Sequence, residues 1–265
     1  MKTRRLIAMA ILSLAATCAR ADQGQLLTWT VGGDQREALV FAPSIEGQGE
    51  KHPVIFAFHG HGGKIKNTAD QMDFQHIWPE AVVVYPQGLN APGAVHDPQG
   101  NAPGWQLRPG DEDDRDLKLF DRMLETMRQK FAVDNRRIYA AGFSNGAIFC
   151  YVLWSQRAPQ LAAIGTVAGR LWPGTQLTSP LPDIHIAGII DSAVLFAWQV
   201  ETIDQAQKIN NLDPWKQGQE CGDCCAEFGA SSPAPVKALF HNGGHVYPPF
   251  ASAAMVKFFK NHPQP

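Results

Sequence analysis

The chain has 265 residues, of which 45% are hydrophobic and 18% charged, and its formal charge is −2 at pH 7. This composition is typical of a globular protein with one large domain and a substantial core. The slight excess of acidic residues argues against nucleic acid as a partner.

The first residues predict a signal peptide, residues 1–21, followed by a catalytic domain at residues 22–265. Lys2, Arg4 and Arg5 form a basic start, residues 6–16 are an apolar run too short to span a bilayer comfortably, and Ala19-Arg20-Ala21 is an A-x-A cleavage site. Cleavage after Ala21 removes four basic residues and no acidic one, which takes the formal charge from −2 to −6. We therefore expect a secreted protein, extracellular or periplasmic, without stable membrane insertion.

Short apolar runs along the mature chain predict β-strands. They lie at residues 25–31, 37–42, 53–59, 81–85, 137–141, 162–168, 184–190 and 236–241. The central runs are continuously apolar, as in parallel strands that are covered on both faces. Helical periodicity or length marks residues 114–131, 147–155 and 251–261. Strands alternating with helices indicate an α/β fold with a mostly parallel central sheet flanked by helices.

Gly142-Phe143-Ser144-Asn145-Gly146 fits the G-x-S-x-G pattern of a nucleophile elbow. An apolar strand precedes it and an apolar helix follows. The two glycines let the strand and helix backbones approach each other closely, and Ser144 is then exposed at a strained corner. An ordinary turn is the alternative interpretation, which the strand–turn–helix context disfavours.

A serine nucleophile needs a base and an acid, which in this topology follow it in the order Ser, Asp or Glu, His. Asp191 comes directly after the predicted strand 184–190, whereas Asp183 precedes that strand and falls at the opposite edge of the sheet. Asp191 is therefore the predicted acid, although an Asp after a strand is often only a turn or cap residue.

His245 is the predicted base. It follows Gly243-Gly244, a corner flexible enough to turn the imidazole toward Ser144. His241 ends a predicted strand and His262 lies in the tail, so neither is as well placed. A surface or packing role is the alternative for any single histidine.

The oxyanion of an acyl-transfer intermediate needs two amide donors. The backbone amides of Asn145, which follows the nucleophile, and His61, in the glycine-rich stretch 58–64 (FHGHGGK), are the predicted pair. His59-Gly60-His61 also resembles the opening of a metallohydrolase zinc site, but no Asp-His pair follows it. We therefore predict no metal and no organic cofactor.

Three further features have both a functional and a structural interpretation. The acidic stretch 111–114 (DEDD) could bind calcium, but capping of the helix that follows is favoured. Trp105 and Trp172 lie on predicted loops and are candidate substrate contacts, with packing as the alternative.

Cleavage of the signal peptide leaves an even number of cysteines, Cys150, Cys221, Cys224 and Cys225, in an exported protein where disulfides form. A vicinal bond between Cys224 and Cys225 is strained, so a bridge from Cys221 to one of them, or from Cys150 to the cluster, is favoured. A zinc site at C-x-x-C-C lacks a second ligand pair.

Several stretches in order resemble the extracellular esterases grouped with polyhydroxybutyrate depolymerases and feruloyl or acetylxylan esterases (carbohydrate esterase family 1) of the α/β-hydrolase superfamily. They are "FAFHGHGG", "VVVYPQGL", "GWQ", "DDRDLKLFDRML", "VDNRRIYAAGFSNGA", "HIAGIID" and "GGHVYPPF". The resemblance implies an α/β-hydrolase fold, with the nucleophile at Ser144, the acid at Asp191, the base at His245 and the oxyanion loop at His61.

Two departures from the family pattern are visible. Relatives often have His-Gly-x-x-Asp before the acid, whereas this chain has Ala187 at the position of the histidine and a more apolar approach to Asp191. Leu212 stands where relatives often have a cysteine, which implies that a family disulfide is rewired through residues 221–225.

The sequence thus predicts a secreted serine esterase that acts through an acyl-enzyme, in an open site without a large lid that suits a polymeric ester substrate as well as a small one. An acyltransferase, a peptidase with the same triad, and an inactive hydrolase fold that only binds its ligand remain alternatives.

Overall fold

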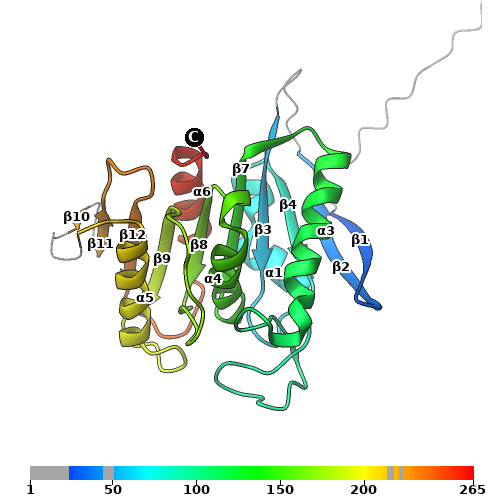
Figure 1. Ribbon diagram of the computed structural model, residues 1–265, viewed down its shortest axis with the longest axis horizontal. Coiled ribbons are helices and arrows are strands. Elements are labelled where there is room, and N and C mark those ends of the chain that lie inside the picture. Colours follow the sequence, from blue (N-terminus) through cyan, green and yellow to red (C-terminus); the bar gives the residue numbers. More distant parts are fainter. Residues whose placement is uncertain (1–23, 44–50, 214–217, 221–223) are drawn as a thin grey trace, which may run out of the picture.

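A computed structural model describes residues 24–43, 51–213, 218–220 and 224–265. The predicted signal peptide and Cys221 lie outside these ranges. The described chain forms a large twisted sheet with helices on both faces (Figure 1), as the apolar runs predicted.

The sheet contains ten strands in the order β1-β2-β4-β3-β7-β8-β9-β12-β11-β10. Their bounds are β1 Gln25–Val31, β2 Asp34–Phe41, β3 His52–Phe58, β4 Val82–Pro86, β7 Val133–Phe143, β8 Ala163–Val167, β9 Asp183–Gly188, β10 Gln219–Glu220, β11 Cys225–Phe228 and β12 Val236–His241. The six strands from β4 to β12 in that order pair in parallel, and antiparallel strands extend both edges. The central parallel strands are buried on both faces, which explains their continuously apolar sequences.

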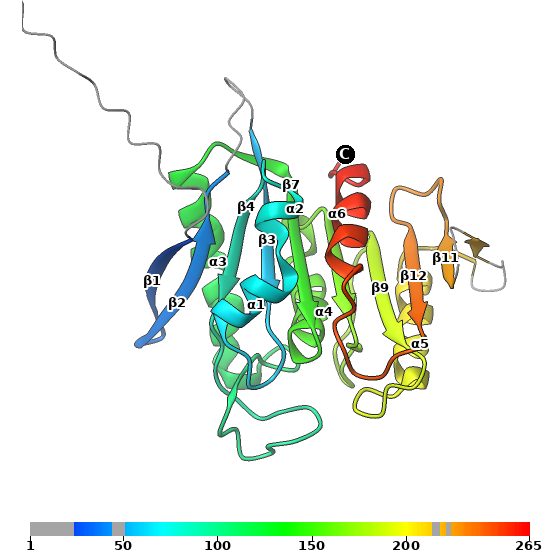
Figure 2. The same ribbon diagram turned by 180° about the vertical axis from the view of Figure 1, so that it is seen from behind.

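Two helical layers cover the sheet (Figures 1 and 2). One layer contains α3 (Arg115–Lys130), α4 (Asn145–Arg157) and α5 (Phe196–Ile209), and the other contains α1 (Ile65–Met72), α2 (Phe74–Ile77) and α6 (Ala251–Asn261). Each layer packs its own hydrophobic cluster against the sheet. Strands β5 (Leu89–Asn90) and β6 (Pro103–Gly104) form a separate hairpin, which the sequence analysis did not predict.

One predicted boundary is wrong in a way that affects the site. Strand β9 ends at Gly188, and the chain turns there because the Asp191 amide donates to the Gly188 carbonyl at 3.1 Å. A side chain at position 188 would meet the Gly243 and Gly244 carbonyl oxygens at 2.4 Å, so the close approach requires glycine. Ile189 and Ile190, predicted as strand, are therefore 44% and 67% exposed.

The acidic stretch 111–114 forms a short 3-10 helix, η1 (Asp111–Asp114), before α3. Its predicted capping function is wrong in detail. Asp114 occupies the N-cap position of α3, but its carboxylate accepts hydrogen bonds from the Gly110 amide and the Gln106 side chain instead of from a helix amide. The Gln106 side-chain oxygen accepts the Leu117 amide at 3.3 Å, so this amide oxygen caps the helix.

Cys225 is disulfide-bonded, whereas Cys150 and Cys224 are free. The alternative that bridged Cys150 to the cluster is thus wrong, since Cys150 is buried inside α4 with a reduced thiol. A bond from Cys221 stays a prediction. Leu212, at the position of the family cysteine, packs against Gly229 beside the main core cluster.

Candidate active site

Ser144 lies at the corner between β7 and α4, with φ 53° and ψ −116°. Its strained conformation costs about 1–3 kcal/mol and is held by the flanking glycines. A Cβ atom at Gly142 would lie 2.3 Å from the Gly146 carbonyl oxygen, and one at Gly146 would lie 2.3 Å from the Phe58 carbonyl oxygen. The Ser144 amide also donates to the Val167 carbonyl at 2.9 Å. The local sequence therefore forms the predicted elbow.

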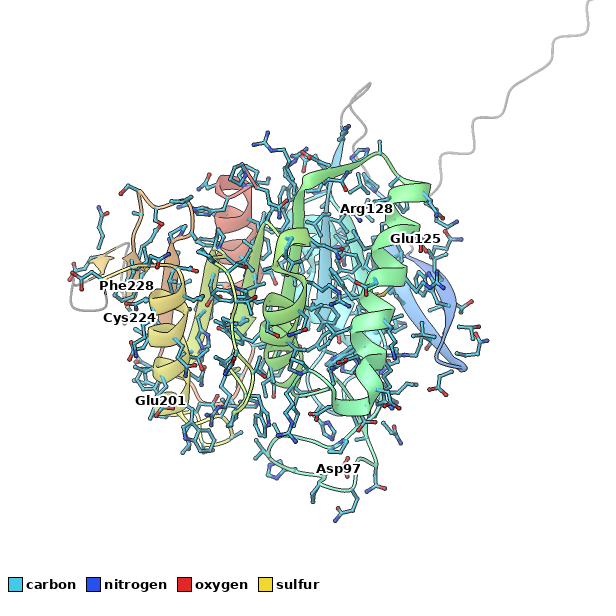
Figure 3. The ribbon with its side chains drawn as sticks, in the orientation of Figure 1. Asp97, Glu125, Arg128, Glu201, Cys224 and Phe228 are labelled. Atoms are coloured by element: carbon cyan, nitrogen blue, oxygen red, sulfur yellow. The ribbon has the colours of Figure 1, made fainter. Side chains whose placement is uncertain are left out.

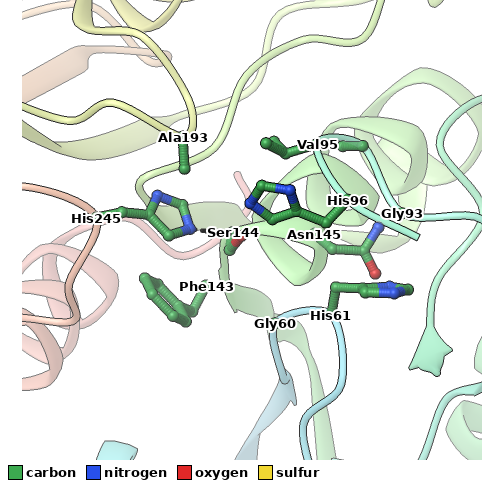
Figure 4. A pocket seen from close by; sticks show the side chains of 11 residues that line it. Gly60, His61, Gly93, Val95, His96, Phe143, Ser144, Asn145, Ala193 and His245 are labelled. Atoms are coloured by element: carbon green, nitrogen blue, oxygen red, sulfur yellow. Dashed lines mark hydrogen bonds between the residues drawn. The ribbon is translucent and has the colours of Figure 1, made fainter. Parts of the chain in front are cut away.

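The structure brings the three predicted side chains together. His245 Nε2 lies 2.8 Å from Ser144 Oγ, and His245 Nδ1 lies 2.9 Å from Asp191 Oδ2. Figure 4 shows His245 directed at the serine from the loop after β12. Each side chain follows the carboxyl end of a parallel strand, which is where this sheet topology gathers a site.

The Asp191 carboxylate is fully buried and accepts several hydrogen bonds. Its Oδ1 accepts the Ala193 and Val194 backbone amides, each at 2.9 Å. Its Oδ2 accepts the Gln199 side-chain amide at 3.2 Å in addition to the contact with His245. The carboxylate is therefore fixed in position behind the imidazole. Asp183 lies at the other end of β9, as predicted.

Asn145 and His61 line the same cavity as Ser144, and their function as the two amide donors stays a prediction. The Asn145 side chain is buried and bonds to the Trp105 backbone, accepting its amide at 2.7 Å and donating to its carbonyl at 3.1 Å. These bonds hold the start of α4 against β6. Within the described part of the chain, neither the His61 nor the Asn145 backbone amide donates to a protein group.

A cavity of about 250 Å³ opens at Ser144. Its walls are the elbow, the His61 loop and residues 93–96 of the loop 91–102 between β5 and β6 (Figure 4). Asp97 on that loop accepts a hydrogen bond from His61 Nε2 at 3.0 Å, and it lies beyond the carboxyl edge of the sheet (Figure 3). The backbone hydrogen bond at Asn101 is the main cause that lowers the pKa of Asp97 to about 2.

The side chain of Trp105 is fully buried, which argues against the substrate contact predicted for it. Its indole donates to the His59 carbonyl at 2.9 Å and packs against Phe58 and Phe149, so it supports the loop at His59 from the core. Trp172 is half-buried and lines a neighbouring cavity of about 430 Å³, so its contact with substrate stays a prediction.

His59 is engaged by protein groups at both ring nitrogens. Its Nδ1 lies 2.7 Å from the Gly60 carbonyl oxygen, and its Nε2 accepts the Gly88 amide at 2.9 Å. Burial lowers the pKa of His59 to about 4, so the ring is neutral at neutral pH. The geometry thus assigns His59 to the support of the loop, in contrast to the zinc alternative.

Sequence reasoning missed two parts of this site. Gln199 lies on α5 among other polar residues, and no motif distinguishes it. The loop 91–102 was not predicted to border the serine, although its glycines and prolines marked it as irregular. Phe143, inside the G-x-S-x-G motif, packs its ring 5.2 Å from that of His245.

The chain is similar in sequence and in fold to several known esterases. Feruloyl esterase C of Emericella nidulans is 26% identical over 237 residues, which cover 84% of this chain and 82% of that protein. Acetyl xylan esterase from Aspergillus awamori has a similar structure, with a TM-score of 0.70, 14% identity and coverage of 89% of this chain and 99% of that chain. The Bacillus cereus carboxylesterase has a TM-score of 0.59 at 19% identity, covering 85% of this chain and 94% of its own.

No protein-family model matches the chain. None of the helices in the described ranges is long and apolar enough to cross a bilayer. The predicted α/β-hydrolase fold and the resemblance to feruloyl and acetylxylan esterases are confirmed, and the chain is a carboxylic-ester hydrolase.

Proposed function

We propose that this hydrolase is an exported serine esterase that uses Ser144, His245 and Asp191 as a catalytic triad and forms an acyl-enzyme. The observation that carries the proposal is the placement of His245, with one ring nitrogen 2.8 Å from Ser144 Oγ and the other 2.9 Å from Asp191 Oδ2. Asp191 fixes the tautomer in which Nδ1 holds the proton and Nε2 is free to accept one.

In the proposed reaction Ser144 Oγ attacks the ester carbonyl carbon while its proton passes to His245 Nε2. The tetrahedral intermediate collapses when His245 returns the proton to the alcohol oxygen, which leaves. Water then attacks the acyl-serine ester, again losing its proton to His245, and the acid departs as Ser144 regains its hydrogen.

The negative charge on the carbonyl oxygen needs donors that are already in place. The backbone amides of His61 and Asn145 are the proposed donors. Asn145 is the first residue of α4, where amides lack partners within the helix. The two hydrogen bonds between Asn145 and the Trp105 backbone keep that amide at the elbow.

The surface around the serine supports a substrate with an apolar acyl or polymer chain. Of the large hydrophobic side chains exposed in the described chain, all but Leu26 lie on loops at the carboxyl edge of the sheet. They are Val95, Ile189, Ile190, Leu195, Val246 and Phe250. An apolar rim of this kind marks a binding surface. We therefore propose an ester of the feruloyl or hydroxyalkanoate type, borne on a polymer.

The first test is hydrolysis of p-nitrophenyl acetate and butyrate by the mature protein beside the Ser144→Ala variant. The wild-type protein is expected to show turnover that the variant loses by at least about 10³-fold. A phosphonate inhibitor should add its mass to the peptide that contains Ser144. A folded protein with neither turnover nor adduct overturns the proposal.

The second test addresses the apolar rim. Ile190→Ser is expected to slow the hydrolysis of a polyester film several-fold while leaving p-nitrophenyl butyrate turnover within twofold. Leu26→Ser is the matched control, because Leu26 is 52% exposed on β1 at the sheet edge, away from the rim. Equal effects of the two substitutions on the film contradict a specific function of the rim.

A further inference from the structure

A buried series of polar side chains extends behind Asp191 into the sheet. Gln199 donates its side-chain amide to Asp191 Oδ2 at 3.2 Å and to the Val194 carbonyl at 2.7 Å. The Gln199 side-chain oxygen lies 3.1 Å from His185 Nε2. His185 Nδ1 in turn lies 2.8 Å from the Tyr151 hydroxyl, which contacts Asp183 Oδ2 at 3.2 Å.

Every member of this series is inaccessible to solvent, with Gln199, His185, Tyr151 and Asp183 all 0% exposed. Buried polar groups reduce stability unless they are fully paired, so such a series is unusual in a core. It begins at the amino end of β9 with Asp183 and ends at the carboxyl end beside Asp191. It therefore links the candidate site to the side of the sheet where the amino ends of the parallel strands lie.

The contacts determine which way the Gln199 amide points. Burial lowers the pKa of His185 to about 4, so the imidazole is neutral and has one donor and one acceptor nitrogen. Since the Gln199 oxygen can only accept, His185 Nε2 is the donor and Nδ1 accepts from the hydroxyl of Tyr151 or Thr166. The Gln199 amide nitrogen is thereby left facing the Asp191 carboxylate.

We propose that Gln199 is a positioning residue for the triad and that His185, held by Tyr151, orients its amide toward Asp191. This proposal rests on the catalytic role proposed for Asp191. Gln199 adds a donor to the same carboxylate oxygen that faces His245, and through Val194 it holds the loop that supplies the two backbone amides for the other oxygen.

Two kinds of neighbouring group face this series in the described part of the chain. The titratable Cys150 thiol lies close enough to Asp183 to interact with its charge, and the Thr166 hydroxyl, which does not titrate, contacts both Tyr151 and His185. At the Asp191 end, burial lowers the pKa of a second imidazole, His241, against a smaller opposite effect of the Asp191 charge. His241 therefore contributes to the pH profile of the site.

Gln199→Leu is expected to lower kcat for p-nitrophenyl butyrate about tenfold with KM within twofold, because the carboxylate and its loop shift relative to His245. The acidic limb of the pH–rate profile should also move to higher pH. An Asp191 carboxylate with one hydrogen-bond donor fewer is less stabilised and therefore favours the protonated form of His245 more strongly. Thr202→Val is the matched control. Thr202 is buried one turn along α5 and bonds to Leu171 and Trp198, away from Asp191.

A second pair of variants tests the orientation step even if Gln199→Leu does not fold. His185→Phe removes the donor to the Gln199 oxygen and should reproduce both changes, whereas His185→Gln can still donate there and should restore most of kcat. Equal kinetics and equal pH profiles for Gln199→Leu and Thr202→Val, or for His185→Phe and His185→Gln, overturn the proposal.

The downfield proton NMR signal of the His245–Asp191 hydrogen bond separates this proposal from the proposed function. Wild-type protein without ester turnover contradicts the proposed function. In that case the NMR signal still tests whether Gln199 positions Asp191. It is expected to shift in Gln199→Leu and in His185→Phe and to stay in place in Thr202→Val. An unchanged signal in all three variants overturns the inference.

Discussion

The two sides of Ser144 are built differently. On the side of the acid, Asp191 is fully buried and accepts hydrogen bonds from two backbone amides, from Gln199 and from His245. On the other side, the loop 91–102 is tied to the site by the contact between His61 and Asp97, whose side chains are 19% and 18% exposed. One side is fixed by the core and the other by a contact at the surface.

This difference follows from the dielectric environment of the two sides. A hydrogen bond between buried groups is strengthened by low dielectric and is costly to break, whereas a partly exposed polar contact competes with water and is weaker. The proposed base and acid therefore lie on the rigid side, whereas the proposed amide donor at His61 borders the loop side. The loop side can vary with little effect on the fold, so we expect it to select the substrate.

The largest effect is expected on the rigid side. Asp191→Asn should lower kcat about 10⁴-fold, because the amide imposes the wrong tautomer on His245. The fold should persist, since the asparagine oxygen still accepts the Ala193 and Val194 amides. Ester hydrolysis and circular dichroism measure the two quantities. Asp204→Asn, at an exposed position of α5, is the control. A loss below about tenfold would exclude Asp191 as the acid.

A pH-dependent change in stability tests the far end of the buried series. Burial raises the pKa of Asp183 to about 8, so the folded chain holds this proton more tightly than the unfolded chain. The contribution of this bound proton to the free energy of unfolding is complete below pH about 4 and is lost as the pH rises toward 8. Asp183→Asn, which cannot ionise, should therefore gain stability relative to wild type between pH 5 and pH 9.

Urea unfolding at pH 5, 7 and 9 measures this difference in the free energy of unfolding, which we expect to grow to a few kcal/mol at pH 9. The Tyr151 hydroxyl contact remains available to the asparagine, so the substitution should leave the fold intact. A difference that does not vary with pH would contradict a raised pKa for Asp183.

Asn145→Ala tests the junction of the two sides. The substitution leaves the buried Trp105 amide without its acceptor and should lower the free energy of unfolding by about 2 kcal/mol. The exposed Asn101 bonds to Asp97 through its side chain, so Asn101→Ala is the matched control and should change stability by less than about 0.5 kcal/mol. Chemical denaturation measures both, and similar values would argue against a structural function of Asn145.

The smallest effect is expected on the loop side. Asp97→Ala removes the contact with His61 and should raise KM for a bulky ester by about three- to fivefold, with kcat nearly unchanged. Steady-state kinetics with small and bulky esters check this result. A fall in kcat of more than about tenfold would place the loop in the catalytic machinery instead.

The elbow and the convergence of Ser144, Asp191 and His245 could be predicted from the sequence because they depend on local and topological rules. The glycines at 142 and 146 are needed wherever a strand turns directly into a helix at this distance, as the 2.3 Å contacts show. Asp191 and His245 follow parallel strands, and the carboxyl ends of such strands meet at one edge. The apolar runs likewise predicted the buried sheet.

Other features depended on contacts between segments far apart in the chain. The burial of Trp105 follows from its packing against Phe58 and Phe149, which no local pattern encodes. The end of β9 at Gly188 is set by the glycines at 243 and 244, so the apolar sequence 189–190 could not distinguish strand from exposed rim.

The sequence by itself determined the fold class and indicated the proposed nucleophile with its proposed base and acid, because strand burial and a tight corner leave a clear pattern of apolar residues and glycines. Only the tertiary structure decided that Gln199 and His185 lie behind Asp191 and that Asp97 holds a loop beside the serine. The partners in these contacts are 8 to 36 residues apart in the chain. A polar side chain has no sequence pattern that identifies such a partner, so the contact is known only once the chain is folded.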